Sequence, residues 1–211
     1  LKVAIFPLHL WLPNAYTYAP SAITSFLAAT ATKVAIYVML RFLFSVFQPG
    51  FLAEVPTLDL LLYPFAILAM FAASYTAILQ RDLKRMLAYS SIGQVGYMLL
   101  GVALLSKSGL MATMIHLFNH GITKAALFMG VGVYVLNGGG SFYHNLRGRG
   151  KTMPWTSAAM VVAGLSLIGV PGTAGFLSKW LLVEAALAQG MWPIALLIVA
   201  SSLLAVIYVW K

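Results

Sequence analysis

Residues 154–190, PWTSAAMVVAGLSLIGVPGTAGFLSKWLLVEAALAQG, form an apolar stretch that is too long for one straight membrane crossing. A crossing helix needs roughly 17–25 residues. In the middle stands GVPGTAG (169–175), where Pro171 removes a backbone donor and the glycines permit a turn, so we expect the helix to break there. Broken helices at membrane depth line protein or water, and in transporters they mark the transport site. The alternative is a proline kink of purely structural use.

The whole chain has the composition of a membrane protein. Of its 211 residues, 62% are hydrophobic and 8% are charged, whereas a soluble domain is about 45–50% apolar and about 25% charged. The sequence therefore predicts an all-α, polytopic membrane helix bundle. Expected helices lie near 1–12 (the end of one), 21–47, 57–80, 86–105, 110–136, 154–190 and 193–210. With no cysteine present, disulfides, iron–sulfur clusters and thiolate metal sites are excluded.

The net charge of +9 fits a membrane topology better than nucleic-acid binding, because the bases gather in alternate connections. One side receives Arg81, Lys84, Arg85, Arg147, Arg149, Lys151 and Lys211; the other receives Arg41 and Lys107, with the acidic residues Glu54 and Asp59. This alternation is the positive-inside pattern. We therefore expect a multi-pass protein of the cell (inner) membrane, with the basic side in the cytoplasm, and no nucleic-acid partner.

Four further bases lie within the expected spans: Lys2, Lys33, Lys124 and Lys179. A charge at the bilayer centre costs roughly 2.5–3.5 kcal/mol on insertion scales. Structural pairing with a carboxylate or a carbonyl explains a single lysine. With Glu184 as the one acidic residue inside a span, carboxylate pairing cannot account for all four. Desolvation disfavours the charged form of an amine, and a proton relay needs groups that release and regain protons.

Span 110–136 carries the most specific local pattern. Thr113, His116, His120, Thr123 and Lys124 fall on one face at about 100° per residue. The histidines and the lysine are spaced one helical turn apart, which predicts a hydrated polar seam. Packing histidines are one alternative. Zinc is another, but no third Cys, Asp or Glu accompanies the pair and the adjacent cation opposes a metal.

Neighbouring spans offer polar faces that can meet this seam. Ser90, Gln94 and Tyr97 share one side of 86–105, and Thr30, Lys33 and Tyr37 share one side of 21–47. Hydroxyls and amides can hold ordered water between titrating groups. Plain interhelical hydrogen bonding is the structural alternative.

Several motifs together resemble one family of membrane proteins. They are PLHLWLPNAYTYAP (7–20) after Lys2, Thr32-Lys33, QRDLKRMLAYSSIGQVGY (80–97), HLFNHGITKAALF (116–128) and PGTAGFLSKW (171–180). All are similar to segments of the antiporter-like proton-conducting subunits. These subunits occur in respiratory NADH:quinone oxidoreductase, in Mrp-type sodium/proton antiporters and in membrane-bound hydrogenases. The resemblance covers essentially the whole sequence.

The resemblance implies a fold of two inverted five-helix repeats, each with a broken helix. The sequence then looks like a fragment: the end of the first repeat at about 1–47 and the second repeat at about 57–211, in one transmembrane domain.

The resemblance also implies residue roles. Lys2 resembles the lysine of the first broken helix, whose glutamate partner lies on an earlier helix. Lys33 resembles the lysine that links two half-channels, His120 and Lys124 the central relay, and Lys179 the terminal residue, which is Lys or Glu among relatives. His116, Ser90 and Thr123 are expected to hold water. Gln94 departs from relatives that have histidine there, and glutamine cannot carry a proton.

The expected function is a proton-translocating subunit without a cofactor, most like the D-type component of an Mrp-type monovalent cation/proton antiporter. The alternative is an M/N-like subunit of NADH:quinone oxidoreductase or of a hydrogenase, with no redox chemistry in this chain itself. From other classes, a passive structural subunit or a quinone-site subunit stays open. Expected partners are other membrane subunits, the lipid bilayer and protons, with sodium as a candidate coupling ion.

Overall fold

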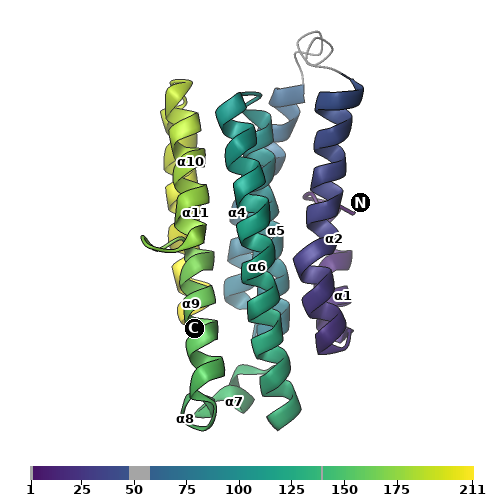
Figure 1. Ribbon diagram of the computed structural model, residues 1–211, viewed down its shortest axis with the longest axis vertical. Helices are drawn as coiled ribbons and strands as arrows, with labels where there is room; N and C mark the ends of the chain where they lie inside the picture. The colour runs from purple at the N-terminus through teal and green to yellow at the C-terminus, as the bar shows by residue number, and fades with distance from the viewer. Residues whose placement is uncertain (1, 48–57, 139) are drawn as a thin grey trace.

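The computed structural model describes residues 2–47, 58–138 and 140–211, and these ranges form an all-α bundle (Figure 1). The predicted fold class is confirmed. In the described ranges, five helices are long and apolar enough to cross a membrane. They are α2 (Ser21–Arg41) with its π-helical extension η1 (Phe42–Val46), α4 (Leu58–Leu79), α5 (Leu83–Ala103), α6 (Lys107–Gly138) and α11 (Trp192–Trp210).

The stretch 154–190 is broken as predicted. It forms α9 (Pro154–Ile168) and α10 (Ala174–Ala188). Gly169 and Gly172 in the connection have φ of +91° and +89°, a conformation that residues with a Cβ atom rarely adopt. Gly169 is the C-cap residue of α9 and donates its N–H to the carbonyl of Leu165. On the other side, the Thr173 hydroxyl accepts a hydrogen bond from the N–H of Phe176 and so caps α10.

The prediction of a helix near 1–12 is wrong. The first helix is α1 (Trp11–Tyr18), and the described residues before it form turns. Proline positions explain the shift: Pro7 cannot donate to a helix, whereas Pro13 stands in the first turn of α1, where a backbone N–H has no intrahelical partner. Pro20 then separates α1 from α2 by serving as the N-cap of α2.

Helix α6 is the hub of the bundle. It packs against α2 and α5, and against both halves of the broken helix, α9 and α10. In Figure 1 the α1–α2 pair lies on one side of α4, α5 and α6, and α9, α10 and α11 lie on the other. A side chain on the inner face of α6 can therefore reach both α2 and α10.

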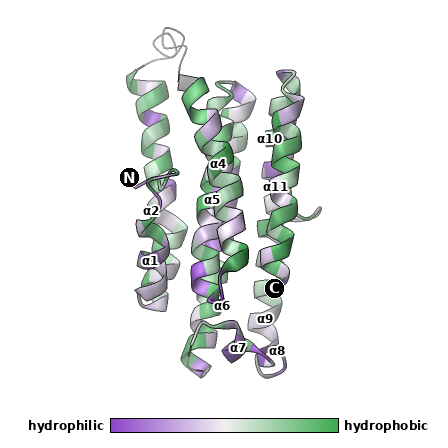
Figure 2. Ribbon diagram, turned by 180° about the vertical axis from the view of Figure 1, so that it is seen from behind, coloured by the Kyte–Doolittle hydropathy of each residue, from purple (hydrophilic) through white to green (hydrophobic). Residues whose placement is uncertain are grey.

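The basic connections gather at one end, as the sequence predicts. Two short helices, α7 (Tyr143–Leu146) and α8 (Arg149–Thr152), lie there, and Figure 2 shows hydrophilic residues over them. Asp82 ties this end together, because its carboxylate accepts hydrogen bonds from the N–H of Arg85 and the hydroxyl of Ser141. The ammonium of Lys211 donates to the carbonyls of Ile78 and Gln80. That this end faces the cytoplasm stays a prediction.

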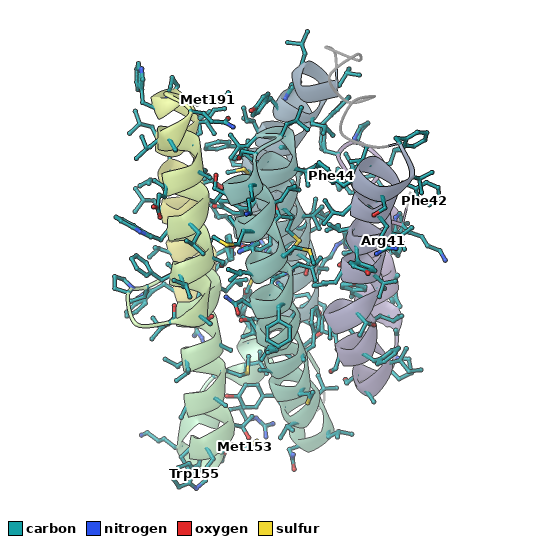
Figure 3. The ribbon with its side chains drawn as sticks, turned by 45° about the horizontal axis from the view of Figure 1, so that its top comes forward. Arg41, Phe42, Phe44, Met153, Trp155 and Met191 are labelled. Carbon is teal, nitrogen blue, oxygen red and sulfur yellow. The ribbon has the colours of Figure 1, made fainter. Side chains whose placement is uncertain are left out.

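The opposite end carries the two bases that the sequence places there. Arg41 is the last residue of α2, and Figure 3 shows Met191 at this end and Met153 and Trp155 at the other. Lys107 begins α6 and is exposed. Glu54 lies outside the described residues.

A substitution at Gly175 tests the close contact between the two halves of the broken helix. A Cβ atom here would collide with the backbone carbonyl of Ser166. We expect Gly175→Ala to destabilise the folded protein by about 1–3 kcal/mol, the usual cost of overpacking. The control is Gly150→Ala, where the nearest atom to a new Cβ is the Ser157 hydroxyl at 3.8 Å. Thermal unfolding of the full-length protein in nanodiscs measures both, and equal stability of the two variants would contradict the contact.

Candidate functional site

The polar stripe of α6 points into the bundle, as the sequence predicts. Lys124 has no exposed surface, and His116 and His120 are 5% and 3% exposed. Thr113 and Thr123 are buried beside them. We call Lys33, Lys124, His120, His116 and Lys179 the buried basic row, because all five are buried and they come from α2, α6 and α10 in that order.

Helix α5 supplies the partners of Lys124. The ammonium nitrogen donates to the carbonyl of Leu87 at 2.7 Å and to the hydroxyl of Ser90 at 2.5 Å. The same carbonyl also accepts the hydroxyls of Ser90 and Ser91. The predicted meeting of the 86–105 face with the α6 stripe is thus confirmed at Ser90. Two neutral acceptors on α5 therefore hold this ammonium group.

The two histidines stack one turn apart. Their ring centres are 6.1 Å apart and their planes differ by 3°. Nδ1 of His116 hydrogen-bonds the hydroxyl of Ser178 on α10 at 2.8 Å. Neither ring nitrogen of His120 has a hydrogen-bond partner among the described residues.

A small cavity adjoins both histidine rings. It has a volume of about 10 Å³, which is about the space that one water molecule requires. The polar side chains that line it are His116, His120, Gln94, Asn119, Thr123 and Ser166. Gln94 and Thr123 therefore line a space beside the histidines, and that they hold water there stays a prediction.

Lys179 closes the row at the helix break. Its ammonium donates to the carbonyls of Ile168 at 2.8 Å and Leu167 at 3.2 Å. These carbonyls belong to the last turn of α9, whose C=O groups lack intrahelical partners and carry the negative end of the helix dipole. The break therefore creates the acceptors that hold the lysine.

Lys33 enters the row from α2, and its ammonium donates to the carbonyl of Ala28. The prediction that Thr30, Lys33 and Tyr37 form one polar face toward α6 is wrong, because only Lys33 is buried. Thr30 bonds its own helix at Phe26, and Tyr37 is 45% exposed. The buried face of α2 includes Thr32, Lys33 and Ile36, so Lys33 lies on it while Tyr37 does not.

Lys2 does not join the row. It is exposed and lies beside Trp11, Phe26 and Thr30 over the outer surface of α2. Its assignment to a relay stays a prediction.

The described part of the chain contains no ion pair with the lysines of the row, and no group of three or more His, Cys, Asp or Glu with metal-ligand geometry. Glu184 is exposed and lies on the outer side of α10. Dipoles of the protein, rather than counter-ions, hold these ammonium groups.

Sequence reasoning missed three polar groups that complete the site. Ser178 binds His116, Ser166 lies 3.3 Å from the Thr123 hydroxyl, and the amide of Asn119 donates to the carbonyl of Ala174. All three connect α6 to the broken helix. Their signal was available as polar residues on otherwise apolar spans within a few residues of the break or of the histidines.

A family model described as "NADH:quinone oxidoreductase/Mrp antiporter, TM" matches residues 1–205. The chain belongs to this family. It is 42% identical over 211 residues to the N subunit of NADH-quinone oxidoreductase from Desulforudis audaxviator, covering 100% of the chain and 42% of that protein. It is 35% identical to the D component of the Na(+)/H(+) antiporter from Alkalihalophilus pseudofirmus, with 100% and 42% covered.

Solved structures agree with this membership. A chain of the Mrp complex from Dietzia sp. superposes with a TM-score of 0.90 at 31% identity, over 99% of this chain and 38% of that chain. The sequence thus spans less than half the length of these relatives. The chain belongs to a transmembrane family, and its described residues include five helices long and apolar enough to cross a membrane, so it is a multi-pass membrane protein.

The thermal stability of a Lys124 variant tests whether the buried ammonium group contributes to the stability of the fold. Replacing a buried charge by an apolar residue of similar size is often neutral or stabilising, and a mid-membrane lysine costs up to about 3 kcal/mol. We expect Lys124→Met to unfold at the same or a higher temperature than wild type in nanodiscs. A large loss of stability would mean that the bonds to Leu87 and Ser90 exist for the fold.

Proposed function

We propose that this chain provides the second proton-carrying half of a proton-translocating membrane subunit. The supporting observation is the buried basic row, which joins α2 to α10 through α6 without an ion pair among the described residues. Each of these lysines is paired with a backbone carbonyl, which would explain a single buried cation. Five ionisable side chains buried together on three helices go beyond that, because ionisable residues inside a membrane span are rare and mark proton relays.

Proton movement along the row follows from repulsion between its members. All five members of the row are buried, and charges repel one another more strongly in a low-dielectric interior than in water. A proton that arrives on one group makes the charge of its neighbour more costly to hold, so occupancy passes from one site to the next. Ionisable groups that interact strongly titrate as a set rather than one by one.

The histidines link the lysines at the two ends. A neutral imidazole accepts a proton on one nitrogen and donates from the other, so it can pass a proton through the ring. His120 has both nitrogens unpartnered within the described structure, and His116 already contacts α10 through Ser178. Gln94 cannot carry a proton, so its contribution is to hold water in the adjacent cavity.

Lys179 is the proposed terminal carrier of this half. It lies at the break between α9 and α10, where backbone groups without helix partners attract water. Lys2, by resemblance, belongs to the other half-channel. We propose the matching division of the chain, with the end of one inverted repeat at about 1–47 and the second repeat at about 57–211.

Two complexes are candidates for the assembly in which the protein works. Relatives are named both as the N subunit of NADH-quinone oxidoreductase and as the D component of an Na(+)/H(+) antiporter. Either assembly requires other membrane subunits to supply the driving force. Neighbouring genes distinguish them: genes for flavin and iron–sulfur subunits accompany the first, and genes for small antiporter subunits the second.

Lys124 provides the direct test of the row. We expect Lys124→Ala in the full-length subunit to reduce proton transport in membrane vesicles by about 100-fold or more, as loss of a proton-transfer group commonly does. Lys107→Ala is the matched control, because it removes an exposed lysine from the same helix. Transport is followed with a pH-sensitive dye after assembly is verified. Wild-type transport by Lys124→Ala would refute the proposal.

Substitutions at Lys179 distinguish a proton carrier from a fixed positive charge. Arginine keeps the cation but has a pKa above about 12 and does not deprotonate usefully. Glutamate reverses the charge but stays titratable. We expect Lys179→Arg to assemble and block transport and Lys179→Glu to retain part of it, measured in the same vesicles. Activity with Arg together with failure of Glu would make Lys179 a counter-charge for the carbonyls of α9.

A further inference from the structure

Tyr97 of α5 stands where the buried basic row meets the broken helix. Its side chain is 2% exposed. The ammonium nitrogen of Lys179 lies 4.7 Å from the centre of its ring, and the ring centre of His116 lies 5.8 Å away. One aromatic ring therefore contacts a lysine on α10 and a histidine on α6.

The hydroxyl of Tyr97 is anchored on a third helix. It shares a hydrogen bond of 3.2 Å with the hydroxyl of Ser202 on α11. Helix α11 is otherwise strongly apolar, yet Ser201 and Tyr208 are also buried in the bundle. The ring is thus held at its Cβ end by α5 and at its hydroxyl by α11, so its position beside Lys179 is fixed.

The Lys179 ammonium lies over the face of the Tyr97 ring, and this arrangement adds an electrostatic attraction to the packing contact. The face of an aromatic ring carries partial negative charge and attracts a cation, and the attraction is stronger when the pair is out of water. Among the described residues, the hydrogen-bond acceptors of Lys179 are two backbone carbonyls. The Tyr97 ring covers a further side of the ammonium group without offering a competing base, so it holds the charge and leaves the protons available.

We propose that Tyr97 is a positioning residue whose ring, anchored to α11 through Ser202, holds the protonated side chain of Lys179 against the free carbonyls of α9. This placement keeps Lys179 beside the ring that also contacts His116. The effect on transport rests on the proposed function of Lys179, whereas the ring–cation contact does not.

A series of fluorinated phenylalanines at position 97 tests the proposal in the full-length subunit within its complex. Fluorine withdraws electrons from the ring face and changes its size very little. With Tyr97→Phe as the reference, we expect proton transport to fall stepwise with one, two and three fluorines, by about threefold to tenfold overall. Equal rates across the series would show that Tyr97 acts by packing alone and would overturn the proposal.

Two controls isolate the cation. The same series in the Lys179→Glu background should lose the stepwise fall, because no cation then faces the ring. The same fluorinated series at Phe128, which is fully buried and has no cation–π contact within the described structure, should leave the rates unchanged. A stepwise fall in either control would assign the effect to general disturbance of the bundle.

A stability cycle keeps this proposal separate from the proposed function. Tyr97→Leu, Lys179→Met and the double variant are compared by thermal unfolding, and a direct contact predicts non-additive shifts. If the shifts are non-additive but Lys179→Met transports protons normally, the contact between Tyr97 and Lys179 stands and the proposed role of Lys179 in transport is refuted. Additive shifts would refute the contact itself. The fluorinated variants keep the shape of the ring, so they serve if Tyr97→Leu does not fold.

Discussion

An ammonium group inside an apolar bundle must find acceptors within the protein, because an unsatisfied charge at that depth is costly. Each lysine of the buried basic row meets this requirement with a backbone carbonyl: Ala28 for Lys33, Leu87 for Lys124 and Ile168 for Lys179. Carbonyl dipoles stabilise a cation without taking its proton. The interior can then hold basic groups in a state from which protons can leave.

The acceptors differ in origin, and this difference explains much of the architecture. Within an intact helix every carbonyl already has an N–H partner, so the Leu87 carbonyl serves Lys124 as an additional acceptor, with the Ser90 hydroxyl beside it. At the break between α9 and α10 the helix ends, so the carbonyls of Leu167 and Ile168 are available to Lys179. The break is therefore as much a cation site as an interruption. Gly169 and Gly172 make it possible by adopting positive φ, and Gly175 lets α10 begin in contact with Ser166.

Helix α6 lies between the acceptors on α5 and those at the break between α9 and α10, and so brings the lysines into one site. Its histidines and Lys124 recur at one-turn spacing on the face that meets α5 and α10. Ser178, Ser166 and the Ala174 carbonyl on the broken helix bind polar groups of α6. These contacts tie the position of Lys179 to the histidines, so a shift of α10 changes the geometry at the end of the row.

The sequence by itself determined the features that depend on local chemistry. Apolar length set the spans, Pro171 and its neighbouring glycines set the break, and helical periodicity set the inward face from Thr113 to Lys124. Only the tertiary structure decided which groups meet across helices. Periodicity did not reveal that Tyr37 faces outward while Lys33 reaches the row, that α1 begins at Trp11, or that Ser178 and Tyr97 flank His116. The reason is physical: a helical pattern fixes the angle of a side chain about its own axis, whereas its partner depends on how two helices are rotated and shifted against each other. That relation is set by packing over the whole bundle.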